Sequence, residues 1–285
     1  MNKLCDLHAH STASDGSLTP TQLVELARDT GLAAVALCDH NTVEGLPEFL
    51  AAGEKLGVEA VPAVEFSTEF EGTELHIIAM FVPPEYYATI TARMDDFKIR
   101  KEKSNIDLVY ALKEAGFDLD YDRIREGRSY VNRAHIGQEL TRLGYTASVQ
   151  EAFKTYLSPK QGYYVPPKRQ DALETVAFIK SMGAVAVLAH PFLDLDEAGL
   201  RRFLTLAKPC GLDAMETMYS KFDPDTEMLA KAIAQEYGIL QSGGSDFHGS
   251  VKPDVFLGKG RGDMAIPYQM LEKLKGKSCK IMKKR

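Results

Sequence analysis

Short apolar runs alternate with amphipathic helical patterns in two separate stretches of the chain, and this alternation restricts the folds open to it. In the first stretch we predict strands at residues 3–7, 32–38, 58–64 and 75–82, and helices at residues 22–29 and 47–56. In the second we predict helices at residues 172–182, 197–207 and 227–237, and strands at residues 184–188, 211–217 and 239–243. Strand and helix alternating in this way predict an α/β fold built on a parallel sheet or barrel.

Between these stretches, residues 84–167 are charged and helical and contain no strong strand pattern. Helices are predicted at residues 87–115, 133–143 and 148–156, and the proline-containing run at residues 161–168 predicts an extended linker. The 285 residues are enough for one barrel with such an insertion. We therefore predict a barrel formed by residues 1–84 and 169–285, with residues 85–168 as a helical insertion that acts as a substrate lid.

Net charge and cysteine content indicate which partners the chain can bind and in which compartment it works. The net charge of −6 argues against broad binding to nucleic acid or anionic membranes, so we expect no membrane association and no stable nucleic-acid complex. The four cysteines include no CxxC pair and the first residues carry no signal-peptide pattern, so we expect reduced thiols and a cytoplasmic location. The basic residues 273–285 are predicted to form a solvated terminal helix and tail.

Most of the seven histidines stand where predicted strands end. Five lie at or just past the end of an apolar run: His8, His10, His40, His190 and His248. Asp15 and Glu65 occupy similar places, whereas His76 lies near the start of its strand. Because the C-terminal ends of barrel strands form the active site in this fold class, these side chains are expected to converge. Asp6 and Asp39 lie beside them, and either they orient a metal ligand or they form strand-end hydrogen bonds.

The spacing within two short segments is typical of a metal site. Residues i and i+2 of an extended segment face the same way, so His8 and His10 present two imidazoles to one point. Asp246 and His248 present a carboxylate and an imidazole in the same manner. Imidazoles and carboxylates without thiolates suit Zn²⁺, Mn²⁺ or Fe²⁺. A single histidine at a strand end is more often structural, but the combined pattern favours metal binding.

Six motifs, in order along the chain, resemble those of the polymerase and histidinol phosphatase (PHP) family. They are residues 6–16 (DLHAHSTASDG), 38–42 (CDHNT), 65–67 (EFS), 75–77 (LHI), 189–191 (AHP) and 244–248 (GSDFH). The resemblance covers nearly the whole chain. It implies a distorted seven-stranded, TIM-like β/α barrel that carries two or three divalent metal ions.

The resemblance also implies which side chains hold the ions. One ion would be held by His8, His10, Glu65 and Asp246. A second would be held by Glu65, His76 and His190, with Glu65 bridging the two ions. The third would be held by Asp15, His40 and His248. All nine positions carry the residue that the family pattern requires.

Within the insertion, residues 133–136 (RAHI) resemble the RPH-type motif of small bacterial PHP phosphoesterases, with alanine in place of the usual proline. That branch includes nucleoside 3′,5′-bisphosphate phosphatases and 5′-to-3′ exoribonucleases. Arg133 is expected to grip a substrate phosphate, and His135 to contact phosphate or donate a proton. A surface ion pair for Arg133 and a helix-packing role for His135 remain open. Weaker candidates for phosphate contacts, each more often a solvated charge, are Arg100, Arg128 and Lys221.

The expected reaction is hydrolysis of a small phosphorylated substrate by metal-activated water, with Glu65 as the bridging ligand and Arg133 and His135 assisting. Nucleotides are the preferred substrates, either nucleoside 3′,5′-bisphosphates or the 5′ ends of short RNA. Three alternatives remain: a histidinol-phosphate phosphatase, an amidohydrolase acting on C–N bonds, and a non-catalytic metal-binding module. The RAHI motif disfavours the first, the third metal group disfavours the second, and the complete ligand set disfavours the last.

Overall fold

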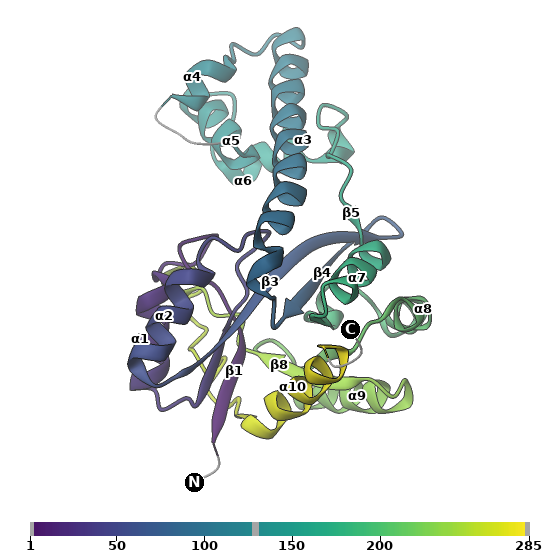
Figure 1. Ribbon diagram of the computed structural model, residues 1–285. Coiled ribbons are helices and arrows are strands. Elements are labelled where there is room, and N and C mark those ends of the chain that lie inside the picture. Colours follow the sequence, from purple (N-terminus) through teal and green to yellow (C-terminus); the bar gives the residue numbers. More distant parts are fainter. Residues whose placement is uncertain (1–2, 127–130, 283–285) are drawn as a thin grey trace. The chain divides into compact units, whose positions relative to one another are not determined.

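The computed structural model describes residues 3–126 and 131–282. The chain divides into two compact units, one formed by Met1–Thr91 with Gln170–Arg285 and the other by Ala92–Arg169. The first unit contains the sheet and the helices that cover it, and the second is helical (Figure 1). Among the described residues, no helix is both long and apolar enough to cross a membrane.

The sheet of the first unit curls into a nearly closed barrel, which confirms the predicted fold class. Its longer strands are β1 (Leu4–Ala9), β2 (Ala34–Leu37), β3 (Glu59–Phe70), β4 (Thr73–Met80), β6 (Val185–Leu188), β7 (Ala214–Tyr219) and β8 (Leu240–Gly244). They lie in the order β8-β7-β6-β4-β3-β2-β1, and the two-residue strands β5 (Gln170–Asp171) and β9 (Ile266–Pro267) pair with β3 and β1. The ends of the order meet, because the amide of Asp246 donates to the carbonyl of His8 at 2.9 Å.

The strand β4 runs antiparallel to both of its neighbours, so the barrel sheet is mixed rather than parallel throughout. A two-residue turn joins β3 to β4, with Phe70 paired to Thr73. Both turn residues have positive φ angles, 50° at Glu71 and 81° at Gly72. This backbone matches the strand twist of a tight hairpin, which leaves no room for the crossover helix that a parallel connection needs.

Helices on either side of the barrel bury the outer faces of its strands. They are α1 (Pro20–Asp29), α2 (Leu46–Leu56), α7 (Ala172–Ser181), α8 (Glu197–Cys210) and α9 (Pro224–Glu236). In Figure 1, α1 and α2 lie on one side of the barrel and α8 and α9 on the other. The barrel interior is apolar, with fully buried side chains such as Leu7, Ala36 and Val187 in one cluster.

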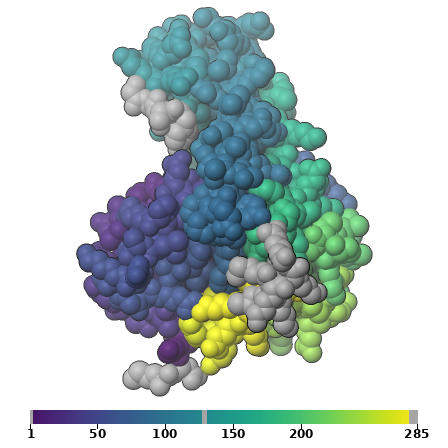
Figure 2. Space-filling view, viewed as in Figure 1, coloured from purple at the N-terminus to yellow at the C-terminus, as the bar shows by residue number. Residues whose placement is uncertain are grey.

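The C-terminal helix α10 (Tyr268–Met282) belongs to the barrel core rather than to a solvated tail. Leu271 and Leu274 are fully buried and join the interior cluster, and the helix contacts β1, β6 and β8. Figure 2 shows the outer side of this helix, in yellow, on the surface. The predicted helix is therefore present and Lys273 is exposed, but the helix is not solvated on all sides, because Leu274 continues the apolar face that begins at Leu271.

The second unit has a hydrophobic core of its own. Its helices are α3 (Tyr87–Glu114), whose first residues belong to the barrel unit, α4 (Tyr121–Arg125), α5 (Arg133–Arg142) and α6 (Val149–Ala152), which continues into a π-helical turn over Phe153–Leu157. Leu108, Leu112, Ile136 and Leu140 are fully buried in this core.

Candidate metal centre

Nine side chains that the sequence singles out meet at one end of the barrel. They are His8, His10, Asp15, His40, Glu65, His76, His190, Asp246 and His248. Most of them lie at or beyond the C-terminal end of a strand. His76 is near the start of β4, but β4 is antiparallel, so its start lies at the same edge as the ends of β3 and β6. The direction of β4 thus explains the one histidine that did not fit the strand-end pattern.

Glu65 lies at the centre of this group, fully buried. Its Oε1 lies 3.0 Å from Nδ1 of His76 and 3.1 Å from Nε2 of His190. Its Oε2 lies 3.3 Å from Nε2 of His8, 3.4 Å from Nε2 of His10 and 3.0 Å from Nδ1 of His40. One carboxylate therefore faces histidines from four different strand ends with its two oxygens.

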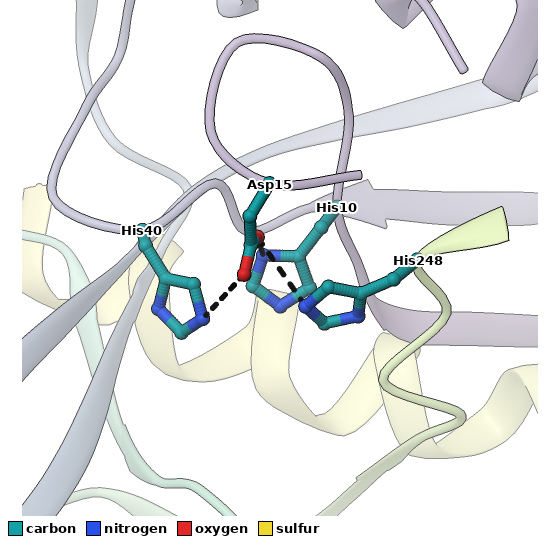
Figure 3. A group of neighbouring side chains, drawn as sticks. All are labelled: His10, Asp15, His40 and His248. Atoms are coloured by element: carbon teal, nitrogen blue, oxygen red, sulfur yellow. Dashed lines mark ion pairs between the residues drawn. The ribbon is translucent and has the colours of Figure 1, made fainter. Parts of the chain in front are cut away.

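Three subsets of these side chains are close enough to hold a cation each. They are His8 with His10 and Asp246, then His40 with Glu65 and His76, and then His10 with Asp15, His40 and His248. The last group converges on Asp15, whose carboxylate oxygens lie 3.3 Å from Nε2 of His248 and 3.8 Å from Nε2 of His40 (Figure 3). Asp15 is also the most exposed of the group, with 53% of its side-chain surface accessible.

The subsets differ in three ways from the division that the family resemblance implies. His10 and His40 each occur in two subsets, so they lie between neighbouring groups. Glu65 occurs only in the subset with His40 and His76 and not in the one with His8, His10 and Asp246, although its Oε2 lies 3.3 Å from Nε2 of His8. His190 is in none of the three, although its Nε2 is 3.1 Å from Glu65.

The electrostatics of the group fit bound cations. Burial opposes ionisation of Glu65, but the surrounding imidazoles of His8, His76 and His40 outweigh it and hold the pKa of Glu65 well below its usual range. Burial lowers the pKa of His10 to about 3. Burial also opposes protonation of His8 and His76, but the carboxylate of Glu65 outweighs it and raises the pKa of His8 well above its usual value and that of His76 to about 10. A metal ligand must offer a lone pair, so binding of a cation at these two imidazoles would release protons.

Several buried polar atoms of the group make no well-aligned hydrogen bond among the described residues, namely Oε2 of Glu65 and the Nδ1 atoms of His10, His40 and His190, although Oε2 of Glu65 lies 3.0 Å from Nδ1 of His40. A buried polar atom without a partner is costly, and coordination of a cation by Glu65 Oε2 and the Nδ1 of His10 or His40 would satisfy it. The donor set contains nitrogen and carboxylate oxygen only, which suits divalent ions such as Zn²⁺, Mn²⁺ or Fe²⁺. The residues present therefore fit the metal ions that the family carries.

Asp6 and Asp39 accept hydrogen bonds from backbone amides and serine hydroxyls rather than from imidazoles. Asp39 accepts from the backbone amide of Ser11 at 2.7 Å and from the hydroxyls of Ser11 and Ser14, which orders the loop that carries Asp15. Asp6 accepts from the amides of His8 at 3.3 Å and Ser245 at 2.9 Å. Of the two interpretations of these aspartates, the strand-end hydrogen bond is the one that the contacts support.

Three further residues at the centre carry no sequence motif that identifies them. Tyr219 and Lys252 donate to Oδ2 of Asp246 at 2.9 Å and 2.7 Å. Glu216, within β7, is fully buried, and its Oε1 lies 2.9 Å from Nδ1 of His8. The only sequence signal for Glu216 is a carboxylate inside an otherwise apolar strand, which costs free energy unless it has a partner.

A pocket of about 290 Å³ opens beside the centre. His40, His76 and His190 line one part of it, and the lysines Lys221 and Lys252 also lie along its wall. Lys221, a weak candidate from the sequence, thus shares a pocket with the predicted metal ligands. The carboxylates of Glu74, Asp194 and Asp246 also line this pocket, so its wall carries charges of both signs.

The other predicted substrate residues lie in the helical unit. Arg133 places its guanidinium 4.3 Å from the ring centre of Tyr164 and donates to the carbonyl of Leu157 at 3.2 Å. His135 accepts from the amide of Asn132 at 3.2 Å as part of the N-terminal cap of α5. Arg100 donates to the carbonyl of Lys168 at 2.7 Å and pairs with Asp96. Arg128 lies outside the described residues.

Comparison with known proteins identifies the family to which the chain is related. A model of the PHP domain matches residues 6–162. A 5′-3′ exoribonuclease of Haemophilus influenzae is 33% identical over 87% of this chain and 91% of its own length. A 3′,5′-nucleoside bisphosphate phosphatase of Chromobacterium violaceum is 28% identical over 85% of this chain and 86% of its own length.

A solved structure supports the same assignment. The crystal structure of a protein from Bifidobacterium adolescentis, classed as a metal-dependent phosphoesterase, has a TM-score of 0.74 and 27% identity over 96% of both chains. The family match covers more than half of this chain, and its barrel gathers the histidines and carboxylates that divalent ions require. The chain therefore belongs to the PHP domain family and is a metal-dependent phosphoesterase.

Proposed function

We propose that the enzyme hydrolyses phosphate esters of nucleotides, either nucleoside 3′,5′-bisphosphates or the 5′ ends of short RNA. The observation that carries the hydrolytic part is the position of Glu65, whose two oxygens face different groups of histidines within 3.4 Å. A carboxylate placed in this way is suited to bridging two cations. Bound divalent ions supply acidity to water and neutralise the charge of the phosphoryl oxygens.

The side chains around the ions have separate tasks in this proposal. The nine histidines and carboxylates hold the cations and fix their places. Lys221 and Lys252, in the wall of the adjacent pocket, attract and orient the phosphate group. Arg133 grips a second phosphate in the forked geometry that suits a guanidinium, and His135 contacts phosphate or donates a proton. Arg100 remains a weaker candidate for such a contact.

The names of the relatives support a nucleotide substrate over histidinol phosphate, since one is an exoribonuclease and the other a nucleoside bisphosphate phosphatase. We further propose two or three ions per chain, with Mn²⁺, Zn²⁺ and Fe²⁺ as the candidates. The free, buried thiols of Cys5 and Cys38 are consistent with the proposed cytoplasmic location.

A substrate panel with Mn²⁺ tests the proposal. We expect nucleoside 3′,5′-bisphosphates or 5′-phosphorylated short RNA to give the highest kcat/KM, above histidinol phosphate, p-nitrophenyl phosphate and dihydroorotate. A preference for histidinol phosphate would overturn the nucleotide assignment. Dihydroorotate tests the amidohydrolase alternative. Its turnover, without turnover of any phosphate ester, would contradict the assignment of phosphoesterase activity to this centre.

The role of Glu65 is tested with a matched pair of variants on one strand. Glu65→Ala removes the carboxylate that faces both histidine groups, so we expect phosphatase activity to fall below the limit of detection while the fold survives. Glu69→Ala removes an exposed carboxylate from the same strand and is the control. Activity of Glu65→Ala within tenfold of the control would contradict the bridging role.

A further inference from the structure

Glu216 is a buried carboxylate that lies outside the set of nine side chains. It lies within β7, its accessible surface is 0%, and its two oxygens make separate contacts. A buried carboxylate is retained only where its partners compensate for the loss of hydration. The identity of those partners indicates what Glu216 does.

The first partner is the imidazole of His8. Oε1 of Glu216 lies 2.9 Å from Nδ1 of His8, and because an ionised carboxylate can only accept, Nδ1 carries the hydrogen. The other ring nitrogen, Nε2, is then the one left to bind a cation at the centre. There it lies 3.0 Å from Nε2 of His10 and 3.3 Å from Oε2 of Glu65. Glu216 therefore fixes both the orientation and the tautomer of this imidazole.

The second partner is the backbone of His190. Oε2 of Glu216 accepts from the amide of His190 at 2.7 Å. The backbone of His190 has a φ of 27°, in the left-handed region that residues other than glycine rarely adopt. A charged hydrogen bond at this amide holds the strained conformation, which directs Nε2 of His190 to within 3.1 Å of Oε1 of Glu65. Glu216 thus contacts two histidines, His8, which faces Oε2 of Glu65, and His190, which faces Oε1.

We propose that Glu216 is a positioning residue that sets the affinity of the centre for its ions, by holding one histidine on each side of Glu65. This inference rests on the proposed metal role of the centre. It requires that the loss of Glu216 weakens metal binding itself, rather than only the stability of β7.

The glutamine variant offers the sharpest test because it preserves the size of the side chain. Both partners of Glu216 are donors, and an amide has only one accepting oxygen, so Glu216→Gln can satisfy one partner and not the other. Glu216→Ala satisfies neither. The control is Asp213→Asn, which changes another buried carboxylate, just before β7. Asp213 pairs with Lys180 at 2.8 Å and Lys277 at 3.3 Å and accepts from the amide of Ala186, and none of these partners is one of the nine side chains.

The measurement is titration of the metal-free proteins with Mn²⁺ or Zn²⁺ in competition with a chelating dye, with ion stoichiometry from elemental analysis. We expect Glu216→Gln to bind roughly 10- to 100-fold more weakly than wild type, and Glu216→Ala to lose at least as much. Asp213→Asn should unfold at a lower temperature and bind within about threefold of wild type, since its contacts are structural.

Two results would overturn the inference: wild-type affinity in Glu216→Gln, or the same loss of affinity in Asp213→Asn. The titration uses no substrate, so it separates this inference from the proposed function. A wild-type protein that binds no ion would refute the centre itself. A wild-type protein that binds ions tightly but cleaves no nucleotide would refute only the proposed substrate.

Discussion

The two oxygens of Asp246 have different surroundings. Oδ1 lies 3.3 Å from Nε2 of His10, on the side of the proposed ions. Oδ2 accepts hydrogen bonds from the hydroxyl of Tyr219 and the ammonium of Lys252. Because Oδ2 is occupied by two donors, Asp246 is held so that a single oxygen faces the centre. The aspartate also has a φ of 58°, so its backbone conformation is strained and depends on such support.

Replacing Lys252 by methionine removes the charged donor and keeps the length of the side chain. We expect kcat/KM to fall roughly 10- to 100-fold, as for the loss of a hydrogen bond to a charged group. Steady-state kinetics with saturating Mn²⁺ would measure it. Lys259→Met, on the same loop but exposed, is the control and should change kcat/KM by less than about twofold. Equal values for the two variants would show that Lys252 has no role at the centre.

Single residues also show how far the sequence predicts the site. All nine predicted ligands come together. Strand ends and i, i+2 spacing single out eight of them along the chain, and the family resemblance adds His76. Glu216, Tyr219 and Lys252 were missed, because their importance depends on which strands are neighbours in the sheet. The pairing of β7 with β6 and β8, which brings Glu216 beside His8 and His190, is not encoded in any local pattern.

Among the elements, β8 and β1 approach each other unusually closely. A Cβ atom added to Gly244, the last residue of β8, would lie 2.1 Å from Cβ of His8 and 2.5 Å from its backbone nitrogen. Only glycine fits where these strands pass, and this close approach brings the Asp246 segment against His8.

Gly244→Ala should therefore destabilise the fold by about 3 kcal/mol or more, because backbone must move to relieve the overlap. Gly276→Ala is the matched control, since it lies in α10 with nothing within 4 Å of the added Cβ. That substitution should raise stability by roughly 0.5–1 kcal/mol through helix propensity. Urea unfolding of both variants would decide the matter, and a Gly244→Ala variant as stable as wild type would contradict the close packing.

The seven longer strands of the sheet could be predicted, but the two-residue strands β5 and β9 could not, and the direction of β4 was missed. The apolar run of β4 indicates a strand but not the way it points, and only the Glu71–Gly72 turn reveals the hairpin. In the helical unit, the sequence predicted the helices except the short α4, and the stacking of Arg133 on Tyr164 could not be read from it. That stacking holds the guanidinium plane in place before any substrate binds.

Arg133→Ala should lower kcat/KM for a nucleoside 3′,5′-bisphosphate by about 2 kcal/mol or more, as for a lost charged hydrogen bond. A generic monoester such as p-nitrophenyl phosphate, which lacks the second phosphate, should lose less. Arg142→Ala, at the other end of α5, removes an exposed arginine and is the control for the helix. Equal losses on both substrates would assign Arg133 to the scissile phosphate, and no loss would assign it to the packing of its own unit.

At the scale of the molecule, the centre joins segments from nearly the whole length of the barrel unit. Nine candidate ligands are too many for one ion of four- to six-fold coordination. We therefore expect more than one transition-metal ion per chain after reconstitution with Mn²⁺ or Zn²⁺, measured by elemental analysis. Removing the ions with a chelator should lower the melting temperature by about 5 °C or more, because bound ligand stabilises the native state by mass action. One ion or fewer per chain would contradict this count.

The contact between β8 and β1 closes the barrel, and it also determines when the metal centre can be complete during folding. The hydroxyl and amide of Ser245 bind Asp6, a residue 239 positions earlier in the chain. Contacts of such long sequence separation form slowly, because the intervening chain must lose much of its freedom before they are made. His40, Glu65 and His76 all lie within the first 76 residues, whereas the groups that use Asp246 or His248 must wait for β8 and the segment that follows it. Metal loading in a nascent chain would then follow the order of synthesis, from the group around Glu65 to the group around Asp15.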